Sequence, residues 1–288
     1  MNTQSRDRTP CESLIIVKGA GDLATGIIHR LWRSGFLVIA TEIENPTMVR
    51  RTVSFAECLY SKHHTVEGVM AVQAEGTTTA EKLSASMKIL DAGSLPITID
   101  PDGEIVPLAR PTALVDAIMA KENLGTRIDQ AEVVVGIGPG FNAGVDVHAI
   151  IETARGHDIG RVILDGKAEP NTGVPGPIGG YTMERLLRSP TAGTFKPYVA
   201  IGDLVRAGDV VAVVGRTAVK AEISGVIRGL LREGIEVKEG YKVGDVDPRA
   251  KVSHCHTISD KSRSVGGGVL EAIMMFLFGV KNSTGQKR

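Results

Sequence analysis

The sequence predicts an α/β protein in which helices cover a parallel sheet and a small all-β domain is inserted late in the chain. Three observations support this prediction. Short apolar runs alternate with helix-length segments over the first part of the 288 residues, as in parallel strands joined by helical crossovers. A glycine-rich pattern then occurs twice in succession, which predicts short antiparallel strands. Finally, the last apolar segment needs another surface to cover it.

The first apolar run and the turn after it have the pattern of a nucleotide-binding site. Residues 14–17 are continuously apolar, which is typical of a strand buried on both faces. Gly19 and Gly21 follow at the spacing that allows a pyrophosphate to approach the backbone, and Ala24 lets the next helix, expected over residues 22–33, pack closely. The pattern predicts a Rossmann-like domain whose cofactor contacts include Gly19, Gly21, Asp22, Leu23 and Ala24.

A second apolar run, residues 36–40, leads to an acidic residue at the distance that this motif requires. Glu42 lies about 20 positions beyond the glycines, where a carboxylate binds the ribose of a dinucleotide. The carboxylate favours NAD, although Arg50 and Arg51 could instead pair with the 2′-phosphate of NADP. The alternative interpretation is a plain glycine turn followed by an ordinary strand-end charge. We expect a nucleotide to bind here, and NAD(P) is one candidate.

Composition excludes several classes of partner. Lys plus Arg equals Asp plus Glu, 33 each, which removes the electrostatic basis for binding nucleic acid or a membrane surface. The cysteines Cys11, Cys58 and Cys255 are scattered, as expected for thiols in a reducing cytoplasm. Residues 1–10 lack the apolar core of a secretory signal, and the apolar segment 265–280 is shorter than a bilayer span of about 20 residues. We therefore expect a cytoplasmic protein without a membrane or nucleic-acid partner.

Strands and helices are expected to alternate as far as residue 164. We predict helices over residues 47–60, 79–90, 113–121 and 145–153 and strands over 66–72, 95–99, 131–137 and 161–164. Gly138, Pro139 and Gly140 follow a strongly apolar strand. They are expected to lie beside the first glycine loop, because open parallel sheets bind ligands at the carboxyl ends of their strands.

Asp146 and His148 are the polar groups nearest this second loop, and we expect them to bind substrate or transfer protons. On the predicted helix, His148 and Glu152 would lie one turn apart and could ligate a metal. Only two ligands are evident, and a capping aspartate beside a surface salt-bridge face is favoured, so no metal is predicted. The Pro- and Gly-rich loop over residues 167–180 is expected to be a lid or a linker; its candidate ligand contacts are Lys167 and Asn171.

After a short helix predicted at residues 183–188, the segment 191–247 changes character. Four glycines mark an internal repeat, because Gly202 and Gly208 recur as Gly234 and Gly240. The pattern resembles the biotinyl/lipoyl carrier fold. It departs from a carrier at Lys220, which lies too close to the following turn and lacks flanking methionines. We expect a small barrel-sandwich domain without a carrier lysine, with a structural or docking role.

The segment after the barrel is dense in chemical groups. His254 and His256 flank Cys255, which could be a thiolate of lowered pKa that attacks or carries sulfur or selenium; the alternative is a buried, inert thiol. Asp260 and Lys261 precede a triple glycine and suggest an anion-binding corner. The final helix is expected to pack on the first domain. The predicted bounds are 1–189 for the Rossmann-like domain, 190–250 for the β domain and 251–288 for the C-terminal segment.

Together these motifs resemble the selenium-dependent molybdenum hydroxylase accessory proteins of the YqeB type. The resemblance covers about residues 15–273 and is carried by residues 19–26, 41–43, 50–56, 138–141, 146–148, 170–173, 244–249 and 258–272. It implies a cytoplasmic maturation factor that helps a molybdenum hydroxylase receive or complete its cofactor, including a selenium or terminal sulfur ligand. It also implies a Rossmann half like that of xanthine dehydrogenase accessory factors, without a settled catalytic mechanism.

Two functions are expected. In the first, the protein matures a client molybdenum hydroxylase and binds a nucleotide or a molybdopterin dinucleotide. In the second, it is an NAD(P)-dependent oxidoreductase acting on a small substrate. A non-catalytic chaperone is a third option, and homo-oligomers are left open. The candidate catalytic residues are Cys255, His148, Asp146 and Lys261, and the candidate cofactor-binding residues are Gly19, Gly21, Asp22, Leu23, Ala24, Glu42, Gly138, Pro139, Gly140 and Asn171.

Overall fold

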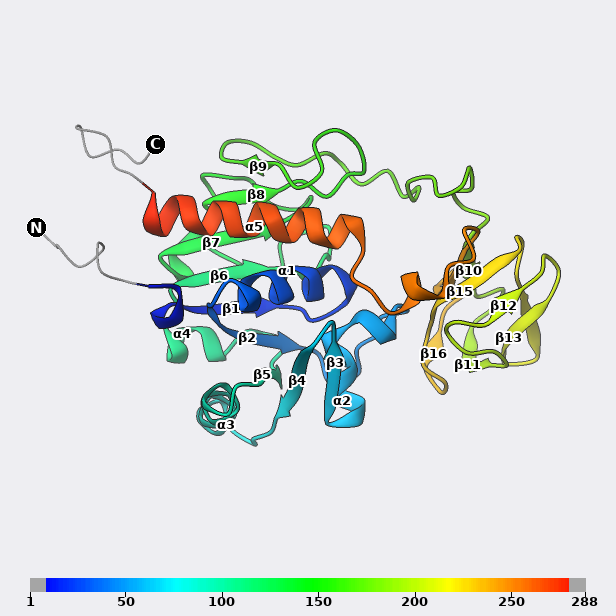
Figure 1. Cartoon of the computed structure of the whole chain (residues 1–288), viewed down its shortest axis with the longest axis horizontal. Helices are drawn as coiled ribbons and strands as arrows, with labels where there is room; N and C mark the ends of the chain where they lie inside the picture. The colour runs from blue at the N-terminus through cyan, green and yellow to red at the C-terminus, as the bar shows by residue number, and fades with distance from the viewer. Residues whose placement is uncertain (1–8, 280–288) are drawn as a thin grey trace, which may run out of the picture. The chain divides into compact units, whose positions relative to one another are not determined.

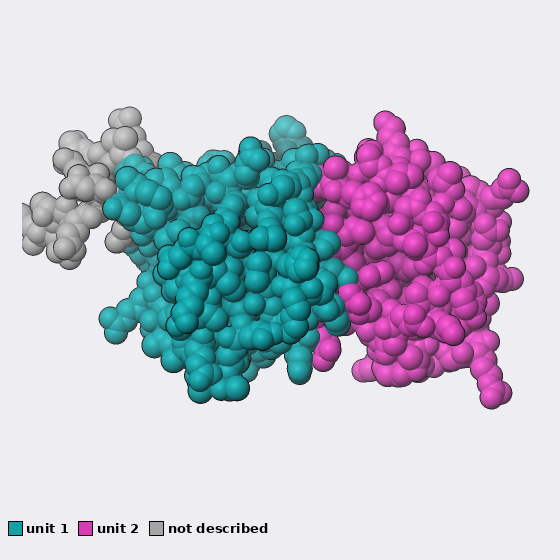
Figure 2. Space-filling model, turned by 60° about the horizontal axis from the view of Figure 1, so that its bottom comes forward, with its two compact units in different colours: residues 1–44, 55–171, 259–288 teal, residues 45–54, 172–258 magenta. Residues whose placement is uncertain are grey.

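The chain folds into two units (Figure 1). A computed structural model describes residues 9–279. Unit 1 comprises residues 1–44, 55–171 and 259–288, and unit 2 comprises residues 45–54 and 172–258 (Figure 2). Unit 2 is therefore larger than the domain expected at 190–250 and includes a short segment from much earlier in the chain. None of the described helices is long and apolar enough to cross a bilayer.

Unit 1 is built on a nine-stranded sheet with the order β3-β4-β5-β2-β1-β6-β7-β8-β9. The strands are β1 (Leu14–Lys18), β2 (Leu37–Glu42), β3 (His63–Val66), β4 (Val69–Ala74), β5 (Leu95–Ile99), β6 (Ala113–Asp116), β7 (Val133–Ile137), β8 (Ala149–Ile151) and β9 (Val162–Ile163). The seven strands between the two edges of this sheet, β4-β5-β2-β1-β6-β7-β8, run parallel to one another. The edge strands β3 and β9 are antiparallel to their neighbours, so the sheet is mixed.

The helices of unit 1 are unevenly distributed along the chain. They are α1 (Asp22–Arg33), α2 (Cys58–Ser61), α3 (Thr79–Asp91), α4 (Ile105–Ala109) and α5 (Asp260–Phe278), with 3₁₀ turns η1 (Pro10–Glu12), η3 (Phe55–Glu57) and η4 (Ile128–Gln130). Leu90 of α3 and Ile105 of α4 belong to the same apolar core as Ile16 of β1. Phe141 and Val147, which lie in a loop, complete this core. A loop therefore fills a place that a crossover helix would fill in a doubly wound sheet.

The prediction of a Rossmann-like parallel sheet domain is wrong. Besides its antiparallel edges, the sheet lacks α-helices in two crossovers, residues 117–132 between β6 and β7 and residues 138–148 between β7 and β8. The helices predicted over 113–121 and 145–153 are instead the strands β6 and β8 with their flanking loops.

Glycines explain why the second crossover is not helical. Gly138, Gly140 and Gly144 have φ values of +71°, +117° and +81°. These values lie in or near the left-handed region, which right-handed helices do not use and which glycine adopts readily. The backbone consequently turns repeatedly where the apolar pattern suggested continuous helix.

Unit 2 consists of two four-stranded antiparallel sheets, β10-β17-β15-β12 and β14-β13-β11-β16. The elements are β10 (Leu186–Arg188), β11 (Gly193–Pro197), β12 (Leu204–Val205), β13 (Val210–Val214), β14 (Thr217–Lys220), β15 (Gly225–Leu230), β16 (Glu236–Val237) and β17 (Lys242–Asp247), with the 3₁₀ turns η2 (Arg51–Val53) and η5 (Val252–Cys255). Phe195, Val211 and Ile227 are fully buried in its core.

The prediction of a separate inserted biotinyl/lipoyl-like barrel is also wrong, because residues far from the insertion complete unit 2. The amide of Leu230 in β15 donates to the carbonyl of Val49 over 2.7 Å, and Arg51 Nε donates to the carbonyl of Leu230 over 2.8 Å. The residues predicted as a helix over 47–60 are thus divided between the two units. Residues 183–188, which were predicted as a short helix, do not form one, and the last three of them form strand β10.

Helix α5 packs along α1 (Figure 1), and two of its three successive glycines allow close approach, Gly266 to α1 and Gly268 to the loop before β9. A Cβ on Gly266 would lie 2.7 Å from the carbonyl oxygen of Gly26 in α1, and a Cβ on Gly268 would overlap the carbonyl oxygen of Gly160. A Cβ on Gly267 would meet nothing within 4 Å. Gly266 and Gly268 therefore allow backbone to approach backbone, which a larger residue would prevent.

Candidate functional site

Polar side chains gather at the carboxyl ends of the central strands of unit 1. The strand order places β2 on one side of β1 and β6 on the other, so the chain changes direction between these two neighbours. Open α/β sheets bind ligands at such switch points. The last residues of β1 and β6 are Lys18 and Asp116, and both are almost fully buried.

Lys18 and Asp116 form a buried cluster with Thr126. Lys18 Nζ lies 3.0 Å from Thr126 Oγ1 and 3.5 Å from Asp116 Oδ2, and the Thr126 hydroxyl donates to Asp116 Oδ2 over 2.6 Å. Each charge therefore has an opposite charge and a hydrogen bond, which compensates its burial. This cluster was not predicted from the sequence, in which its signal is a charged residue at the end of each of two apolar runs.

The first glycine loop is held by Glu42. The amide of Ala20 donates to Glu42 Oε2, and the amide of Ile43 donates to Oε1, each over 2.9 Å. Burial raises the pKa of Glu42, while these two amides act in the opposite direction. Gly19 has φ of +96°, and a Cβ there would lie 2.9 Å from the carbonyl oxygen of Ala117. Glu42 thus holds the loop at Ala20 through Oε2, while Oε1 accepts from its own neighbour Ile43.

The helices α1 and α5 begin next to each other. Gly21, at the N-cap of α1, provides no side-chain cap, and Leu23 and Ala24 lie in the first turn. Helix α5 is capped by Ser259, whose hydroxyl accepts from the amide of Ser262. The hydroxyl of Ser262 then donates to Asp22 Oδ1 over 3.2 Å. This bond joins the two helix starts, where the partial positive charges of both helices are concentrated.

Lys261 lies at this junction and is half-buried. Burial lowers the pKa of Lys261, and Arg155 lowers it further; Asp22, Glu152 and Asp260 act in the opposite direction. Within residues 9–279, the ammonium of Lys261 forms no hydrogen bond and no ion pair. It is therefore a charge that is partly removed from water and has no direct partner in the described chain.

The acidic groups around Lys261 have other partners. Arg155 donates to both carboxylate oxygens of Asp260, over 2.8 and 3.0 Å. Glu152, which is 3 % exposed, accepts from the amides of Thr153 and Ala154 through Oε1 and from the amide of Glu169 through Oε2. The Glu152 carboxylate is therefore satisfied by backbone.

His148 and Glu152 do not share a helix face, because strand β8 separates them. The Nδ1 atom of His148 accepts from the amide of Val134 over 3.0 Å, and its ring packs edge-on against Phe276. Asp146 Oδ2 accepts from the amide of Asn142. Among the residues that the structure describes, no group of three or more His, Cys, Asp or Glu side chains is arranged to hold a metal ion.

The second glycine loop and the Pro-rich loop differ in how they are held. A Cβ on Gly138 would lie 2.6 Å from Thr153 Oγ1, and a Cβ on Gly140 would lie 2.8 Å from the amide of Glu122, so both glycines allow close packing. Pro139 between them is half-buried. Asn171 is exposed and is the last residue of unit 1 before the chain enters unit 2.

Cys255 belongs to unit 2 and is fully buried. Its Sγ donates to the carbonyl of Ile227 over 3.6 Å. Burial raises the pKa of Cys255, and the nearby Arg50 and Arg228 act in the opposite direction. This is the reverse of the lowered pKa expected for an attacking thiolate. The geometry fits the alternative, a buried and inert thiol.

The three thiols should therefore differ sharply in reactivity. Cys11 is exposed, while Cys58 and Cys255 are buried. Burial, with the charge of Glu57, raises the pKa of Cys58 to about 12, so about one thiol in 10⁴ is ionised there at pH 8. We expect a single fast phase with a disulfide reagent such as Ellman's reagent, and none after Cys11→Ser. A fast phase that persists in this variant would contradict the burial of the other two thiols.

Comparison with known proteins gives one close relative in sequence. No family model matches the chain. A protein of Escherichia coli (strain K12) described as "Uncharacterized protein YqeB" is 48% identical over 269 residues, which cover 93% of this chain and 49% of that protein. The similarity to YqeB extends over almost the whole length of this chain. The predicted resemblance to a YqeB-type protein is confirmed to this extent, and the chain spans about half the length of YqeB.

Solved structures resemble the chain only weakly. An aspartoacylase family protein from Mesorhizobium loti is 13% identical, with 84% of this chain and 86% of that chain covered and a TM-score of 0.27. The ectoine utilization protein EutE (DoeB) from Ruegeria pomeroyi is 13% identical, with 81% and 84% covered and a TM-score of 0.24. A succinylglutamate desuccinylase/aspartoacylase from Rhodobacter sphaeroides is 14% identical, with 81% and 84% covered and a TM-score of 0.27. A likeness of this size transfers neither a fold nor an activity.

These findings correct the predicted function and cofactors. The description of YqeB names no function, and the likeness to the solved structures is too weak to supply one. The predicted maturation and oxidoreductase functions are therefore withdrawn, together with the molybdenum, selenium and nucleotide-binding assignments. In the site itself, Glu42, which was predicted to bind the ribose of a dinucleotide, accepts the backbone amides of Ala20 and Ile43.

Proposed function

We propose that unit 1 binds a small anionic molecule at the carboxyl edge of its sheet, where α1 and α5 begin. The charged contact is Lys261. The observation that carries this proposal is its half-buried ammonium, which has no hydrogen bond or ion pair within the described residues. An anionic group bound there would supply the missing partner and would offset part of the cost of burying the charge.

The neighbouring charges support an anion as the occupant. Asp260 is held by Arg155 in a two-point contact, and Glu152 accepts three backbone amides, so neither carboxylate is left unsatisfied. Helix α1 has no side-chain cap, and its first turn contributes partial positive charge. A carboxylate or phosphate group is small enough and strong enough as an acceptor for such a corner.

Some of the residues predicted from the sequence lie at the proposed anion site, and others only support the loop beside it. Gly19, Gly21, Asp22, Leu23 and Ala24 form the turn and the helix start, with Lys261 beside them. Gly138 and Gly140 are close-packing positions of the neighbouring loop. The location in the cytoplasm and the partners considered from the sequence, a client hydroxylase and a second copy of the chain, stay predictions.

Replacing Lys261 by methionine is expected to weaken the binding of acetate, succinate or inorganic phosphate about tenfold or more, because a charge-assisted contact is worth about 1.5–3 kcal/mol. The measurement is NMR of lysine side chains carrying ¹³C-methyl groups, with each anion titrated in turn. In wild-type protein, the signal lost in Lys261→Met should titrate at lower pH than exposed lysines, since the pKa of Lys261 is lowered. Anion binding should then weaken as the pH rises through this lowered pKa, because the ammonium loses its charge.

The matched control is Lys88→Met, which removes an exposed lysine near the end of α3. It should leave both the anion affinity and the Lys261 signal unchanged. Equal affinities in the Lys261 and Lys88 variants, or a Lys261 signal that does not respond to any of the three anions, would contradict the proposal.

A further inference from the structure

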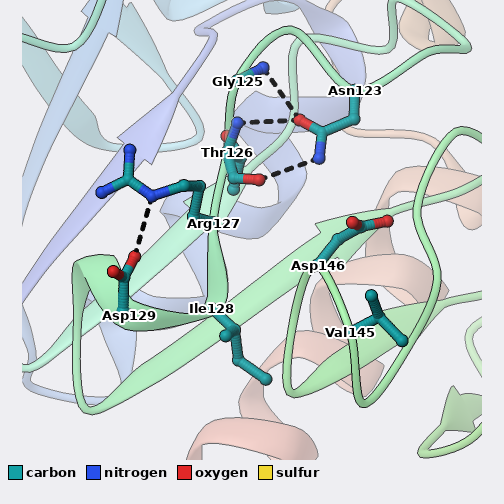
Figure 3. A pocket seen from close by; sticks show the side chains of 8 residues that line it. All are labelled: Asn123, Gly125, Thr126, Arg127, Ile128, Asp129, Val145 and Asp146. Carbon is teal, nitrogen blue, oxygen red and sulfur yellow. Dashed lines mark hydrogen bonds and ion pairs between the residues drawn. The ribbon is translucent and has the colours of Figure 1, made fainter.

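A pocket of about 470 Å³ opens in unit 1, and nothing described so far uses it. It lies between the two crossovers that lack an α-helix. One wall is formed by Asn123 and residues 125–129, from the crossing between β6 and β7, and the other by Val145 and Asp146, from the crossing between β7 and β8 (Figure 3). Its volume is within the range of sites for small molecules.

The first wall is held in place by side-chain hydrogen bonds. Asn123 Oδ1 accepts from the amides of Gly125 and Thr126, over 3.0 and 2.7 Å, and its Nδ2 donates to the carbonyl of Thr126. The Thr126 hydroxyl is in turn fixed by the buried pair of Lys18 and Asp116. The polar groups of this wall are therefore engaged within the protein, and the wall keeps its shape without a ligand.

The charges of the pocket are unbalanced. Arg127 Nε donates to Asp129 Oδ1 over 3.0 Å, so these two charges compensate each other. Asp146 Oδ2 accepts one backbone amide, that of Asn142, and the carboxylate has no cationic partner among residues 9–279. The pocket thus retains one negative charge that a bound cation could pair with.

Apolar surface lies beside this carboxylate. Val145 is 63% exposed, which is unusual for a valine beside a pocket, and Ile128 faces it from the opposite wall (Figure 3). A methylene chain placed between them would remove apolar area of both side chains from water. The pocket therefore offers one carboxylate and a short apolar slot.

We infer that this pocket binds a small aliphatic amine. The ammonium group pairs with the carboxylate of Asp146, and the methylene chain lies against Val145 and Ile128. The ion pair of Arg127 and Asp129 lines the same pocket, and because its charges compensate each other it leaves Asp146 as the charge that binds the ammonium. This site and its ligand class are independent of the anion site at Lys261.

The test uses 1,4-diaminobutane as the probe and the whole chain labelled with ¹⁵N. We expect the amide signals of Gly125, Thr126 and Val145 to shift on titration, and 1-butanol, which has a similar chain and no ammonium, to leave them unchanged. Asp146→Asn should weaken the diamine about tenfold or more. The asparagine Oδ1 can still accept from the amide of Asn142, so the loop is retained. The matched control, Asp102→Asn, removes an exposed carboxylate after β5 and should bind as wild type does.

A second variant, Val145→Ser, removes the apolar contact at an exposed position where folding does not depend on it. It should weaken the diamine several-fold while the heat-unfolding midpoint stays unchanged. The inference is overturned if wild-type protein shows no shifts up to about 10 mM diamine, if Asp146→Asn and Asp102→Asn bind equally, or if 1-butanol produces the same shifts as the diamine.

Discussion

Replacing Gly268 by alanine is expected to lower the free energy of unfolding by about 3 kcal/mol. The new methyl group would overlap the carbonyl oxygen of Gly160 and lie 2.9 Å from Ile151 Cγ2. Gly160 cannot easily move aside, because its amide donates to the carbonyl of Glu152 over 2.9 Å. The strain must then be relieved by shifting α5 away from the sheet, which exposes apolar surface.

The chain supplies its own control for this change. At Gly267, one position earlier, a methyl group would have no atom within 4 Å, so Gly267→Ala should raise stability by about 0.5–1 kcal/mol through its better helix propensity. The single tryptophan, Trp32, lies in α1 and reports on unit 1 during urea unfolding. Equal midpoints for the two variants would contradict the close contact assigned to Gly268.

Replacing Asp245 by alanine is expected to destabilise unit 2 by about 3–5 kcal/mol. Asp245 is buried in β17, where Arg185 Nη1 lies 2.5 Å from Oδ1 and Arg228 Nη1 lies 3.9 Å from Oδ2. Both arginines are more than nine-tenths buried. Removing the carboxylate leaves guanidinium charge in a site with little access to water, and this costs more than the ion pair itself contributes.

An exposed ion pair gives the comparison. Asp158 lies 2.6 Å from Arg161, with both side chains more than half exposed, so Asp158→Ala should change stability by about 0–1 kcal/mol. Hydrogen exchange of β15 and β17 amides measures the effect of Asp245→Ala in unit 2, and exchange of β8 and β9 amides measures the effect of Asp158→Ala in unit 1. Equal losses of protection in the two variants would show that the buried pair contributes no more than the surface pair.

The sequence was most informative where strands are apolar on both faces. The runs predicted at 14–17, 36–40, 95–99 and 131–137 correspond to β1, β2, β5 and β7. The strands β6 and β8 were predicted as helix, because a short buried apolar run has no periodicity that separates strand from helix. Their pairing with β1 and β7 decides their structure, and such pairing involves residues distant in sequence.

The candidate site was predictable only in its local parts. The glycine turn, the start of α1 and the possibility of an anion corner at Lys261 follow from adjacent residues. The pairing of Arg155 with Asp260 does not, because the fold brings together residues 105 positions apart. The spacing correctly placed the carboxylate of Glu42 beside the glycine loop, but it could not show that Oε2 accepts from the amide of Ala20 and Oε1 from that of Ile43.

The division of the chain into alternating segments has a consequence for synthesis on the ribosome. Unit 1 is started first, yet α5 emerges only after every residue of unit 2 has been made. At about 5–20 residues per second, the chain between α1 and α5 takes roughly 10 to 45 seconds to be made, and the surface of α1 that α5 covers stays uncovered for that time. Unit 2 can close before unit 1 does. During this interval the newly made chain therefore exposes the face of α1 around Gly26 on which α5 later packs, a surface that a chaperone could cover.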